Sequence, residues 1–372
     1  MVRVMKKANS FMKAVSSPRL LVVQTGFLGD VVLTTPLLTT LHQHLAPASL
    51  TVLTTPQAKP LLDCHPVVTQ VFVDAKRAEG RGLAGLWRMA QRLRRERFTL
   101  AVAAHKSFRT ALLLMLAGIP QRIGFRQSPG WFLYHQTANR DPNRHEVERI
   151  LCIMRAFGLE PEDCDRTPRV IYNHDAKAKA EALLHEAGIG TTEPLFVVCP
   201  GSVWATKRWT VDGFAGLVRH LEQHYGRVLL CGGPDDGPIA QMVHERSGQQ
   251  SVNVVGRTDL QTFMALMDRA QVVISNDSAP MHLAVARDVP VVAIFCATTP
   301  RLGYGPYSNR AVVVEKKDLF CRPCRPHGGP SCPRGTEDCM RQVTVTDVLA
   351  GVDTLLAIAG KPTLQSPLPA HG

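Results

Sequence analysis

The sequence lacks a hydrophobic run long enough to cross a membrane as a helix. Its longest nearly uninterrupted apolar stretch, residues 111–119, is about half of the ~20 residues that a spanning helix needs. Basic residues near the start of the chain have no apolar segment behind them, which argues against a cleaved signal peptide. We therefore expect a cytoplasmic protein that contacts a membrane only from its surface, if at all.

Acidic residues are scarce relative to basic ones. The chain has 31 Asp and Glu against 43 Lys and Arg, which gives a formal net charge of +12. This excess favours anionic partners such as nucleotides, nucleic acid or an acidic membrane surface. With 45% hydrophobic and 20% charged residues, the composition excludes global disorder. A chain of 372 residues is expected to form two domains.

Cysteine is too infrequent for a disulfide scaffold, because only ten cysteines are spread over the chain. Cys199, Cys231 and Cys296 fall in apolar, strand-like runs, where a thiol packs as a small hydrophobic group. Four others have a spacing similar to that of a metal-binding knot, although the second pair lacks the CxxC of a zinc ribbon: Cys321, Cys324, Cys332 and Cys339. This cluster is either a packed, reduced loop or a structural metal or redox-sensitive site.

Strand and helix patterns alternate along the whole chain. Residues 19–25 form an apolar run typical of a buried parallel strand, and residues 26–29 turn the chain into a helix. Further strands are expected in two series, at 50–54, 67–73, 99–104 and 122–125, then at 195–199, 227–231, 252–254, 271–275, 290–295 and 310–314. This alternation predicts an α/β protein of two Rossmann-like domains facing across a cleft, with ligands at the carboxyl ends of both sheets.

The composition along the chain also predicts where the domains end. We expect a basic N-terminal extension over 1–18, a first domain over 19–170, a second over 171–345, a C-terminal helix over 346–360 and a disordered tail over 361–372. The polar segment 141–193 is broken by prolines, and we interpret it as the bridge between the two domains.

The first candidate site is the loop after the first strand, which contains Gly26, Gly29 and Asp30. Glycines permit a tight turn, and the new helix offers free N–H groups and the positive end of its dipole. The loop is neither GxGxxG nor a P-loop. Asp30 is either a helix N-terminal residue or a carboxylate that takes a proton from an alcohol.

The second candidate site is the segment 199–209, which again follows a strand. It contains Ser202, Lys207 and Arg208, and these hydroxyl and basic groups are suited to holding a phosphate. The alternative is a solvated loop whose tryptophans pack on the sheet.

The third candidate site is the segment 275–282, between a strand and a short helix. Asp277 or Ser278 can cap this helix, and the exposed N–H groups beyond them can bind an anion. His282 taken alone is more typical of a packed histidine than of an acid or a ligand.

Two other motifs have simpler interpretations. Asp163-Cys164-Asp165 matches the DxD pattern of some metal-dependent sugar-nucleotide enzymes, but it lies in the expected bridge and not at a strand end. The segment 87–97 places Arg88, Arg92 and Arg95 on one helical face. That face is typical of a solvated helix and is also suited to phosphorylated lipid.

Together these motifs resemble those of the bacterial lipopolysaccharide heptosyltransferases of glycosyltransferase family 9, most closely the enzymes that add the second heptose. The resemblance covers roughly residues 20–356. It rests on four motifs. The first is the Gly-x-x-Gly-Asp sequence at residues 26–30, and the second is the segment 107–110 together with the segment 117–124. The third is the segment 199–201 together with 207–209, and the fourth is the segment 276–278 together with 281–282. It implies a GT-B fold and an inverting transfer of heptose from an ADP-sugar to a hydroxyl of the lipopolysaccharide inner core, without metal or other cofactor.

The resemblance also implies roles for individual residues. Asp30 is the general base, and Lys207, with Ser202 and the turn 277–279, holds the diphosphate as ADP leaves. Asp235 or Asp236 contacts the ribose. The further residues implied are Gly26, Gly29, Arg208, Asp277, Ser278, Ala279 and His282 for substrate binding, and Lys106, Arg109 and Arg122 on the acceptor side. The implied partners are ADP-heptose, a Kdo-lipid A type acceptor and, transiently, the inner leaflet of the inner membrane, but no nucleic acid.

The sequence departs from the family pattern at two places, and other functions stay open. Ala279 stands where the family often has glycine, and Gln24-Thr25-Gly26 replaces a more usual basic or serine-containing lead-in. The alternatives are another family 9 enzyme with a different donor or acceptor, a non-catalytic sugar-nucleotide-binding protein, and a nucleic-acid-binding protein with a metal knot.

Overall fold

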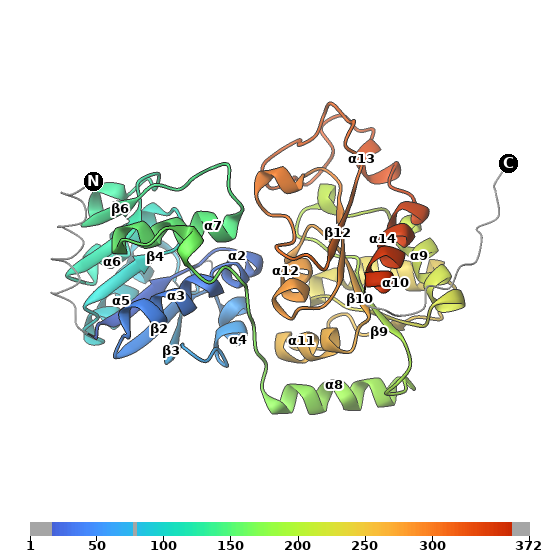
Figure 1. The fold of residues 1–372 in the computed structure, drawn as a ribbon, viewed down its shortest axis with the longest axis horizontal. Helices are drawn as coiled ribbons and strands as arrows, with labels where there is room; N and C mark the ends of the chain where they lie inside the picture. Colours follow the sequence, from blue (N-terminus) through green and yellow to red (C-terminus); the bar gives the residue numbers. More distant parts are fainter. Residues whose placement is uncertain (1–16, 77–79, 359–372) are drawn as a thin grey trace. The chain divides into compact units, whose positions relative to one another are not determined.

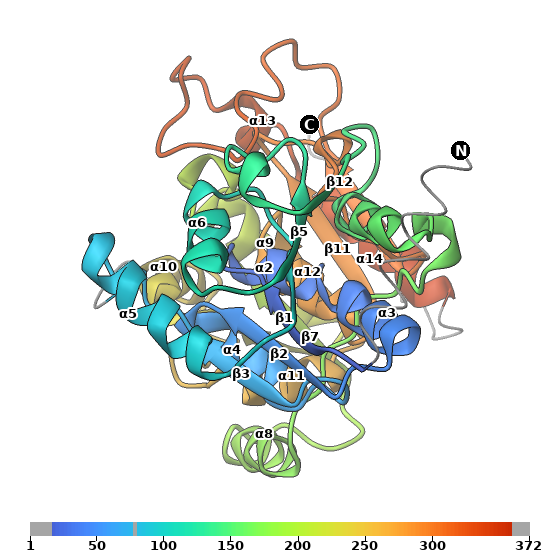
Figure 2. The same cartoon turned by 90° about the vertical axis from the view of Figure 1, so that its left-hand side faces the viewer.

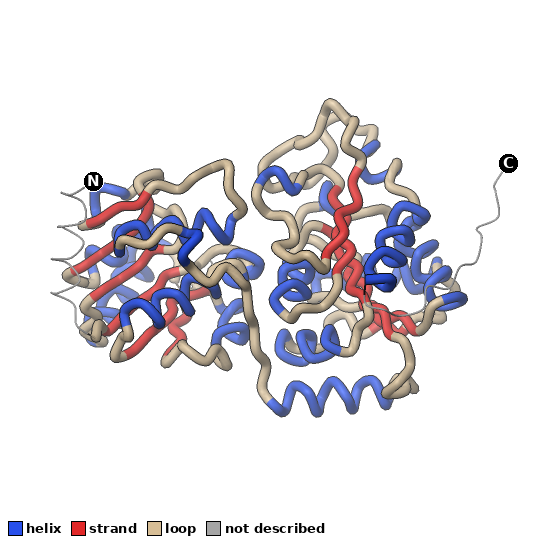
Figure 3. Tube along the Cα trace, in the orientation of Figure 1, coloured by secondary structure: helices blue, strands red, loops and turns tan. Residues whose placement is uncertain are grey.

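The computed structural model of the chain describes residues 17–76 and 80–358, and the chain divides into two compact units between Ile171 and Tyr172 (Figure 1). The expected tail, most of the expected N-terminal extension and the last two residues of the expected C-terminal helix lie outside the described residues. Each unit is built on one six-stranded sheet, and the strands of the first sheet lie side by side in Figure 3. The predicted α/β class with two Rossmann-like domains is thereby confirmed.

The sheet of the first unit has the strand order β3-β2-β1-β4-β5-β6, and each pairing is parallel. Its strands are β1 (Arg19–Val23), β2 (Ser49–Thr54), β3 (Gln70–Val73), β4 (Leu100–Ala103), β5 (Gln121–Phe125) and β6 (Gln136–Ala138). A central parallel strand is covered on both faces, which explains the continuous apolar sequence of β1.

Helices cover both faces of this sheet. Helices α5 (Gly82–Arg95) and α6 (Phe108–Leu116) lie on one face, and α3 (Thr35–Leu45) and α7 (Glu146–Leu151) lie on the other (Figure 2). Leu93 of α5 and Leu114 of α6 are fully buried in one core with Val23 of β1. The shorter helices of this unit are α2 (Leu28–Val32) and α4 (Lys59–Leu62), with the 3-10 turns η1 (Pro56–Ala58), η2 (Trp131–Leu133), η3 (Cys152–Phe157) and η4 (Pro161–Asp163).

The second unit repeats the topology of the first. Its sheet has the order β12-β11-β10-β7-β8-β9 with parallel pairings, which is the order of the first sheet read in reverse. The strands are β7 (Leu195–Cys199), β8 (Arg227–Leu230), β9 (Val252–Asn253), β10 (Val272–Asn276), β11 (Val291–Phe295) and β12 (Ala311–Glu315). In both units the first, central strand is followed by a loop at the carboxyl edge, where such folds bind ligands.

The helices of the second unit also form two layers. Helices α9 (Val211–His224), α10 (Gly237–Arg246) and α14 (Val345–Ile358) cover one face, and α11 (Leu260–Asp268) and α12 (Ala279–Ala286) cover the other (Figure 1). The remaining elements are α8 (His174–Glu186), α13 (Asp338–Arg341), η5 (Ala205–Lys207), η6 (Pro234–Asp236) and η7 (Pro300–Leu302). Trp209 and Phe214 pack edge to face in the core under α9.

The prediction of a bridge over 141–193 is wrong for most of its length. Residues up to Ile171 belong to the first unit, where Ile150, Ile153 and Met154 are fully buried. Helix α8 belongs to the second unit and packs against α11. The prolines of this segment therefore mark turns within folded units, because enough apolar side chains lie between them to be buried.

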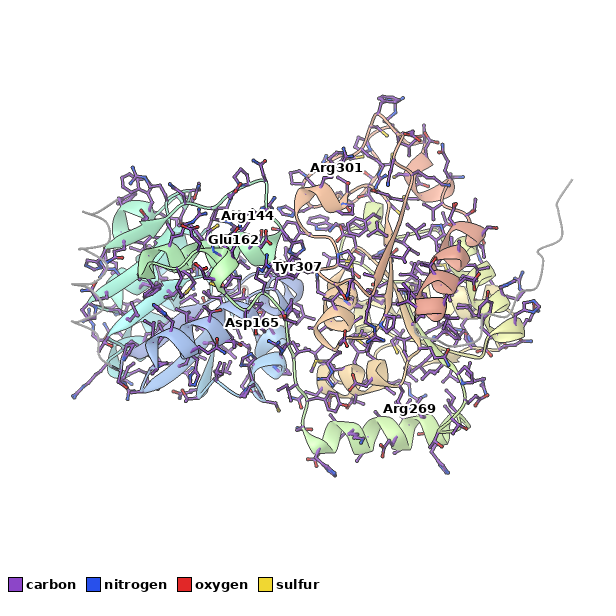
Figure 4. All side chains as sticks on the ribbon, viewed as in Figure 1. Arg144, Glu162, Asp165, Arg269, Arg301 and Tyr307 are labelled. Atoms are coloured by element: carbon purple, nitrogen blue, oxygen red, sulfur yellow. The ribbon has the colours of Figure 1, made fainter. Side chains whose placement is uncertain are left out.

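Ionic contacts fix the end of the first unit. Arg144 forms an ion pair with Glu162, and the two labelled residues lie close together in Figure 4. Asp163 accepts a hydrogen bond from the backbone N–H of Glu160, and Asp165 pairs with Arg169. The DxD carboxylates are thus engaged in local structure.

Within the described residues, no helix combines the length and the apolar character that crossing a membrane requires. The longest helices of these residues, α5, α9 and α14, have 14 residues each.

Candidate functional site

The loop after β1 is held in a fixed turn by its own side chains. The carboxylate of Asp30 accepts a hydrogen bond from the backbone N–H of Phe27 (2.9 Å), and the amide oxygen of Gln24 accepts one from the N–H of Gly26 (3.0 Å). The hydroxyl of Thr34 donates to the backbone oxygen of Asp30 (2.7 Å). Both interpretations of Asp30 are therefore compatible, because a carboxylate in the first turn of α2 also stands at the carboxyl edge of the sheet.

Gly26 is required for this geometry. A Cβ at position 26 would lie 2.6 Å from Oδ2 of Asp30 and 3.0 Å from Oε1 of Gln24, which is too close for either contact. We expect Gly26→Ala to displace the Asp30 carboxylate and to lower the rate of catalysis ~10- to 100-fold, as a misplacement of about 1 Å does.

The matched control for Gly26→Ala is Gly190→Ala in the second unit. A Cβ at position 190 would meet its nearest atom, Cβ of Glu193, at an ordinary 3.8 Å. The two variants are compared by steady-state turnover and by thermal unfolding. Equal turnover in both would show that the position of Asp30 tolerates a methyl group at 26.

His105, a half-buried histidine after β4, supports the same loop. The Nδ1–H of His105 donates to the backbone oxygen of Val23 (3.2 Å), so Nε2 is the acceptor for the hydroxyl of Thr110 (3.1 Å). Nε2 also lies 3.4 Å from the hydroxyl of Thr25, whose backbone oxygen accepts from Lys76 (2.5 Å). Burial of the ring, opposed only in part by the Val23 contact, lowers the pKa of His105 to about 4.

This lowered pKa predicts a pH-dependent stability. Between pH 6.5 and about 4 the unfolded chain binds a proton at His105 that the folded chain does not, so the free energy of unfolding falls as the pH falls through this window. Urea unfolding at pH 7 and pH 5 is expected to show the fall, and His105→Gln to reduce its slope. His65, whose pKa burial also lowers to about 4, accounts for a residual slope. Parallel profiles for wild type and His105→Gln would contradict the assignment.

The three residues expected on the acceptor side lie in different places. Lys106 follows the carboxyl end of β4 and is exposed. Arg109 donates to both carboxylate oxygens of Asp74 (3.3 Å each) and to the backbone oxygen of Gly80 (3.0 Å). Arg122 stands opposite Ala101, near the amino ends of β4 and β5, and donates to the backbone oxygens of Ile119 and Leu133. The structure thus places Lys106 and Arg109 at the Asp30 edge of the sheet and Arg122 away from it.

In the second unit, a buried ion pair joins two of the expected loops. The Nζ of Lys207 lies 2.7 Å from Oδ2 of Asp277, and both side chains are largely buried. The hydroxyl of Thr298 donates to the same oxygen (2.6 Å). Asp277 therefore fixes the position of the Lys207 ammonium at the carboxyl edge of β10.

Asn276 attaches the loop after β7 to the end of β10. Its amide donates to the backbone oxygens of Pro200 (2.8 Å) and Gly201 (3.3 Å), and its side-chain oxygen accepts from the N–H of Trp209 (2.9 Å). Arg208 donates to the backbone oxygen of Ser202 (2.8 Å), which closes the loop on itself. Asn276 was predicted only as part of a motif, because its fully buried side chain has no signature of its own in the sequence.

The expected side-chain cap of α12 is absent. Ser278 is the N-cap residue, but it makes no side-chain cap, and its hydroxyl lies 3.2 Å from that of Ser275. Asp277 is occupied by Lys207 and Thr298. The prediction that one of these two side chains caps the helix is wrong. In the first turn of α12, Pro280 has no N–H and the N–H of Met281 donates to the backbone oxygen of Ser278 (3.2 Å), so the donor that this turn offers is the N–H of Ala279. His282 is buried within this helix.

Of the two adjacent carboxylates after β8, the one at position 236 faces the loop after β7. A Cβ on Gly201 would lie 2.0 Å from Oδ1 of Asp236, so these groups are in direct contact. Burial raises the pKa of Asp236. The N–H of Gly233, which donates to Oδ2 (3.0 Å), and the charge of Arg208 lower that pKa but only in part. Asp235 is exposed. The ribose contact stays a prediction for either residue.

The segment that contains the four cysteines contacts the loop of Lys207. The sequence did not indicate this contact. The hydroxyl and the backbone N–H of Thr206 both donate to the backbone oxygen of Gly329. The N–H of Gly329 donates in turn to the Thr206 hydroxyl. A Cβ on Gly328, whose φ is +79°, would lie 3.0 Å from Cγ of Lys207. The glycine pair 328–329 therefore permits the close approach of the two segments.

The four cysteines themselves line one cavity of about 160 Å³. All four are free thiols: Cys321, Cys324, Cys332 and Cys339. Within the described residues, no three His, Cys, Asp or Glu side chains are placed so that they could hold a metal ion. The four side chains lie together, and the choice between a reduced loop and a metal or redox site stays open.

Known proteins are similar to this chain over most of its length. The model of glycosyltransferase family 9 (heptosyltransferase) matches residues 86–330. Lipopolysaccharide heptosyltransferase 2 of Salmonella typhimurium is 25% identical over 306 residues, which are 80% of this chain and 88% of that protein. Lipopolysaccharide heptosyltransferase 3 of Escherichia coli is 26% identical over 339 residues, which are 89% of this chain and 97% of that protein.

Solved structures share the fold. A glycosyltransferase family 9 protein from Veillonella parvula superimposes with a TM-score of 0.82 at 23% identity, over 92% of this chain and 98% of that chain. The Escherichia coli ADP-heptose lipopolysaccharide heptosyltransferase II superimposes with a TM-score of 0.75 at 22% identity, over 92% and 99%. The two six-stranded parallel sheets therefore form a GT-B architecture.

Proposed function

Because the chain belongs to glycosyltransferase family 9, we propose that it transfers L-glycero-D-manno-heptose from ADP-heptose to the inner core of lipopolysaccharide, as the enzyme that adds the second heptose. The observation that carries the donor half of this proposal is the buried Lys207–Asp277 pair beside the uncapped start of α12. A fixed ammonium and the N–H of Ala279 at one strand end are suited to a diphosphate.

The proposed reaction is a single displacement. The Asp30 carboxylate takes the proton of the acceptor hydroxyl. At the same time the oxygen of that hydroxyl forms a bond to the anomeric carbon of the donor. The bond from that carbon to the β-phosphate oxygen breaks, and ADP leaves with the electron pair. Attack opposite to the leaving group inverts the anomeric configuration. Lys207 and the N–H of Ala279 at the start of α12 stabilise the charge that develops on the diphosphate.

The proposal includes that no metal ion takes part in the chemistry. A diphosphate leaving group needs positive charge beside it, and the Lys207 ammonium with the α12 dipole supplies that charge. We expect transfer to continue in excess chelator with no added divalent ion. Loss of activity that returns with a divalent metal would overturn this part alone.

The experiment is mass-resolved transfer from ADP-heptose to Kdo2-lipid A acceptors that carry one or two heptoses. Addition to the acceptor with one heptose alone supports the second-heptose assignment. Addition only to the acceptor with two heptoses favours the alternative suggested by the relative named heptosyltransferase 3. Binding of ADP-heptose without transfer to either acceptor would favour a different acceptor or a non-catalytic protein. The configuration of the product, read by NMR, tests the inversion.

A further inference from the structure

Large apolar side chains are exposed at one edge of the first unit. Five of them come from three segments that follow β3, β4 and β5, and we call them the apolar rim: Leu83 (81% exposed), Trp87 (51%), Phe108 (48%), Trp131 (40%) and Phe132 (61%). Scattered exposed apolar residues are common on proteins, but a group of this kind at one edge marks an interaction surface.

Three rim residues form a contiguous patch beside the start of α6. A Cβ on Gly130 would lie 2.6 Å from Cβ of Ala111 and 3.4 Å from the ring of Phe108, so the η2 turn is pressed against α6. The rings of Trp131 and Phe132 meet edge to face at 6.1 Å. The guanidinium of Arg126 lies 3.4 Å over the Trp131 ring, so a cation stands at the border of the patch.

The other two rim residues stand at the start of the neighbouring helix. Leu83 and Trp87 are four residues apart on α5 and share a face, which lies between its buried face and its face of exposed arginines. Arg109 of α6 donates to Gly80, just before α5, and Arg94 of α5 donates to the backbone oxygen of Leu116 at the end of α6. Helices α5 and α6 are therefore parallel, and their first turns lie at the same end.

That end is the edge of the sheet where Asp30 lies. Arg109 also pairs with Asp74, which directly follows β3, so the start of α6 is fixed at the carboxyl end of that strand. Asp30 belongs to the loop after β1 in the same parallel sheet. The apolar rim and the proposed general base therefore share the carboxyl edge of the first unit.

We propose that the apolar rim inserts into the surface of an anionic lipid bilayer and thereby presents a lipid-anchored acceptor to the Asp30 edge. The proposal rests on the proposed function for the acceptor, but the binding surface is argued from this chain alone. Tryptophan and phenylalanine side chains bordered by arginines are the combination that enters a headgroup region. The exposed Arg88, Arg92 and Arg95 of α5 add attraction to anionic lipid, although Arg92 also stacks over Phe72 at 4.3 Å.

The test uses the whole chain and vesicles of phosphatidylcholine with or without phosphatidylglycerol. We expect binding to the anionic vesicles, weakened by salt, and a loss of affinity of at least ~10-fold in Leu83→Ser/Trp87→Ser/Phe132→Ser, because three apolar side chains no longer enter the bilayer. These side chains are exposed, so the fold should tolerate the changes. An equally strong affinity in the triple variant would overturn the proposal.

The matched control is Phe320→Ser in the second unit. Phe320 is 85% exposed and has the guanidinium of Arg334 4.6 Å from its ring, so it reproduces the aromatic and cationic features of the rim at another place. We expect no change in its vesicle affinity. An equal loss in this control would mean that any exposed aromatic residue contributes, and would overturn the assignment to the rim.

Insertion is measured separately from adsorption. Brominated acyl chains should quench the fluorescence of Trp87 and Trp131, and Trp87→Phe/Trp131→Phe should remove the quenching. Binding without quenching would show electrostatic adsorption only and would overturn insertion. Because these vesicles contain neither donor nor acceptor, the result does not depend on the transfer activity. If the proposed function holds, the triple variant should lose transfer to the lipid-embedded acceptor and keep transfer to a delipidated one.

Discussion

Replacing Asp30 with asparagine is expected to lower the transfer rate at least ~100-fold and to leave the affinity for ADP essentially unchanged. The carboxylate is the proposed proton acceptor, and an amide cannot take a proton at neutral pH. The affinity for ADP should persist because the residues proposed to hold the diphosphate, Lys207 and the start of α12, belong to the second unit. Single-turnover transfer and ADP titration calorimetry measure the two quantities.

Asparagine is the informative substitution because Asp30 also has a structural contact. Its Oδ2 accepts the N–H of Phe27 at 2.9 Å, and an asparagine oxygen can accept the same hydrogen bond. Asp30→Ala removes both the contact and the base. If Asp30 only holds the turn, Asp30→Asn should keep most of the activity that Asp30→Ala loses. Similar losses in both variants identify the proton transfer as the missing function.

The fold was predictable because parallel strands covered on both faces need continuous apolar sequence. β7 was predicted with its observed bounds, and β1 was predicted within two residues at its end. β6 was missed, since its three residues Gln136–Ala138 contain no apolar run. The segment 141–193 was interpreted as a bridge because of its prolines and polar residues, although the predicted domain bounds placed residues up to 170 in the first domain. Its buried apolar side chains, such as Ile150 and Met154, fold residues up to Ile171 into the first unit.

From the residues alone the candidate site was predictable as separate motifs, and only the family resemblance implied that Lys207 and the turn 277–279 act together. Lys207 and Asp277 are 70 positions apart, and no local pattern shows that the first is the charge partner of the second. The contact of Gly328 and Gly329 with Thr206 and Lys207 is also long-range, and only the adjacent glycines hint at a close approach. Such contacts depend on how strand ends meet, which composition and periodicity do not specify.

The ion pair makes Lys207 the second position where a large effect is expected. Lys207→Met should weaken ADP binding ~10- to 100-fold, since it removes a charge-assisted contact to the diphosphate. It should also lower the free energy of unfolding by about 3 kcal/mol, because the carboxylate of Asp277 is left buried with only the Thr298 hydroxyl beside it.

A double variant separates the two effects. Asp277→Asn in the Lys207→Met background removes the unpaired charge, and an asparagine oxygen can still accept the Thr298 hydroxyl. We expect this change to restore most of the lost stability in urea unfolding, while ADP affinity measured by calorimetry stays low. If affinity returns together with stability, Lys207 acts only through the folding of its loop. If affinity stays low in a stable double variant while Asp277→Asn alone keeps it, the ammonium itself binds the diphosphate.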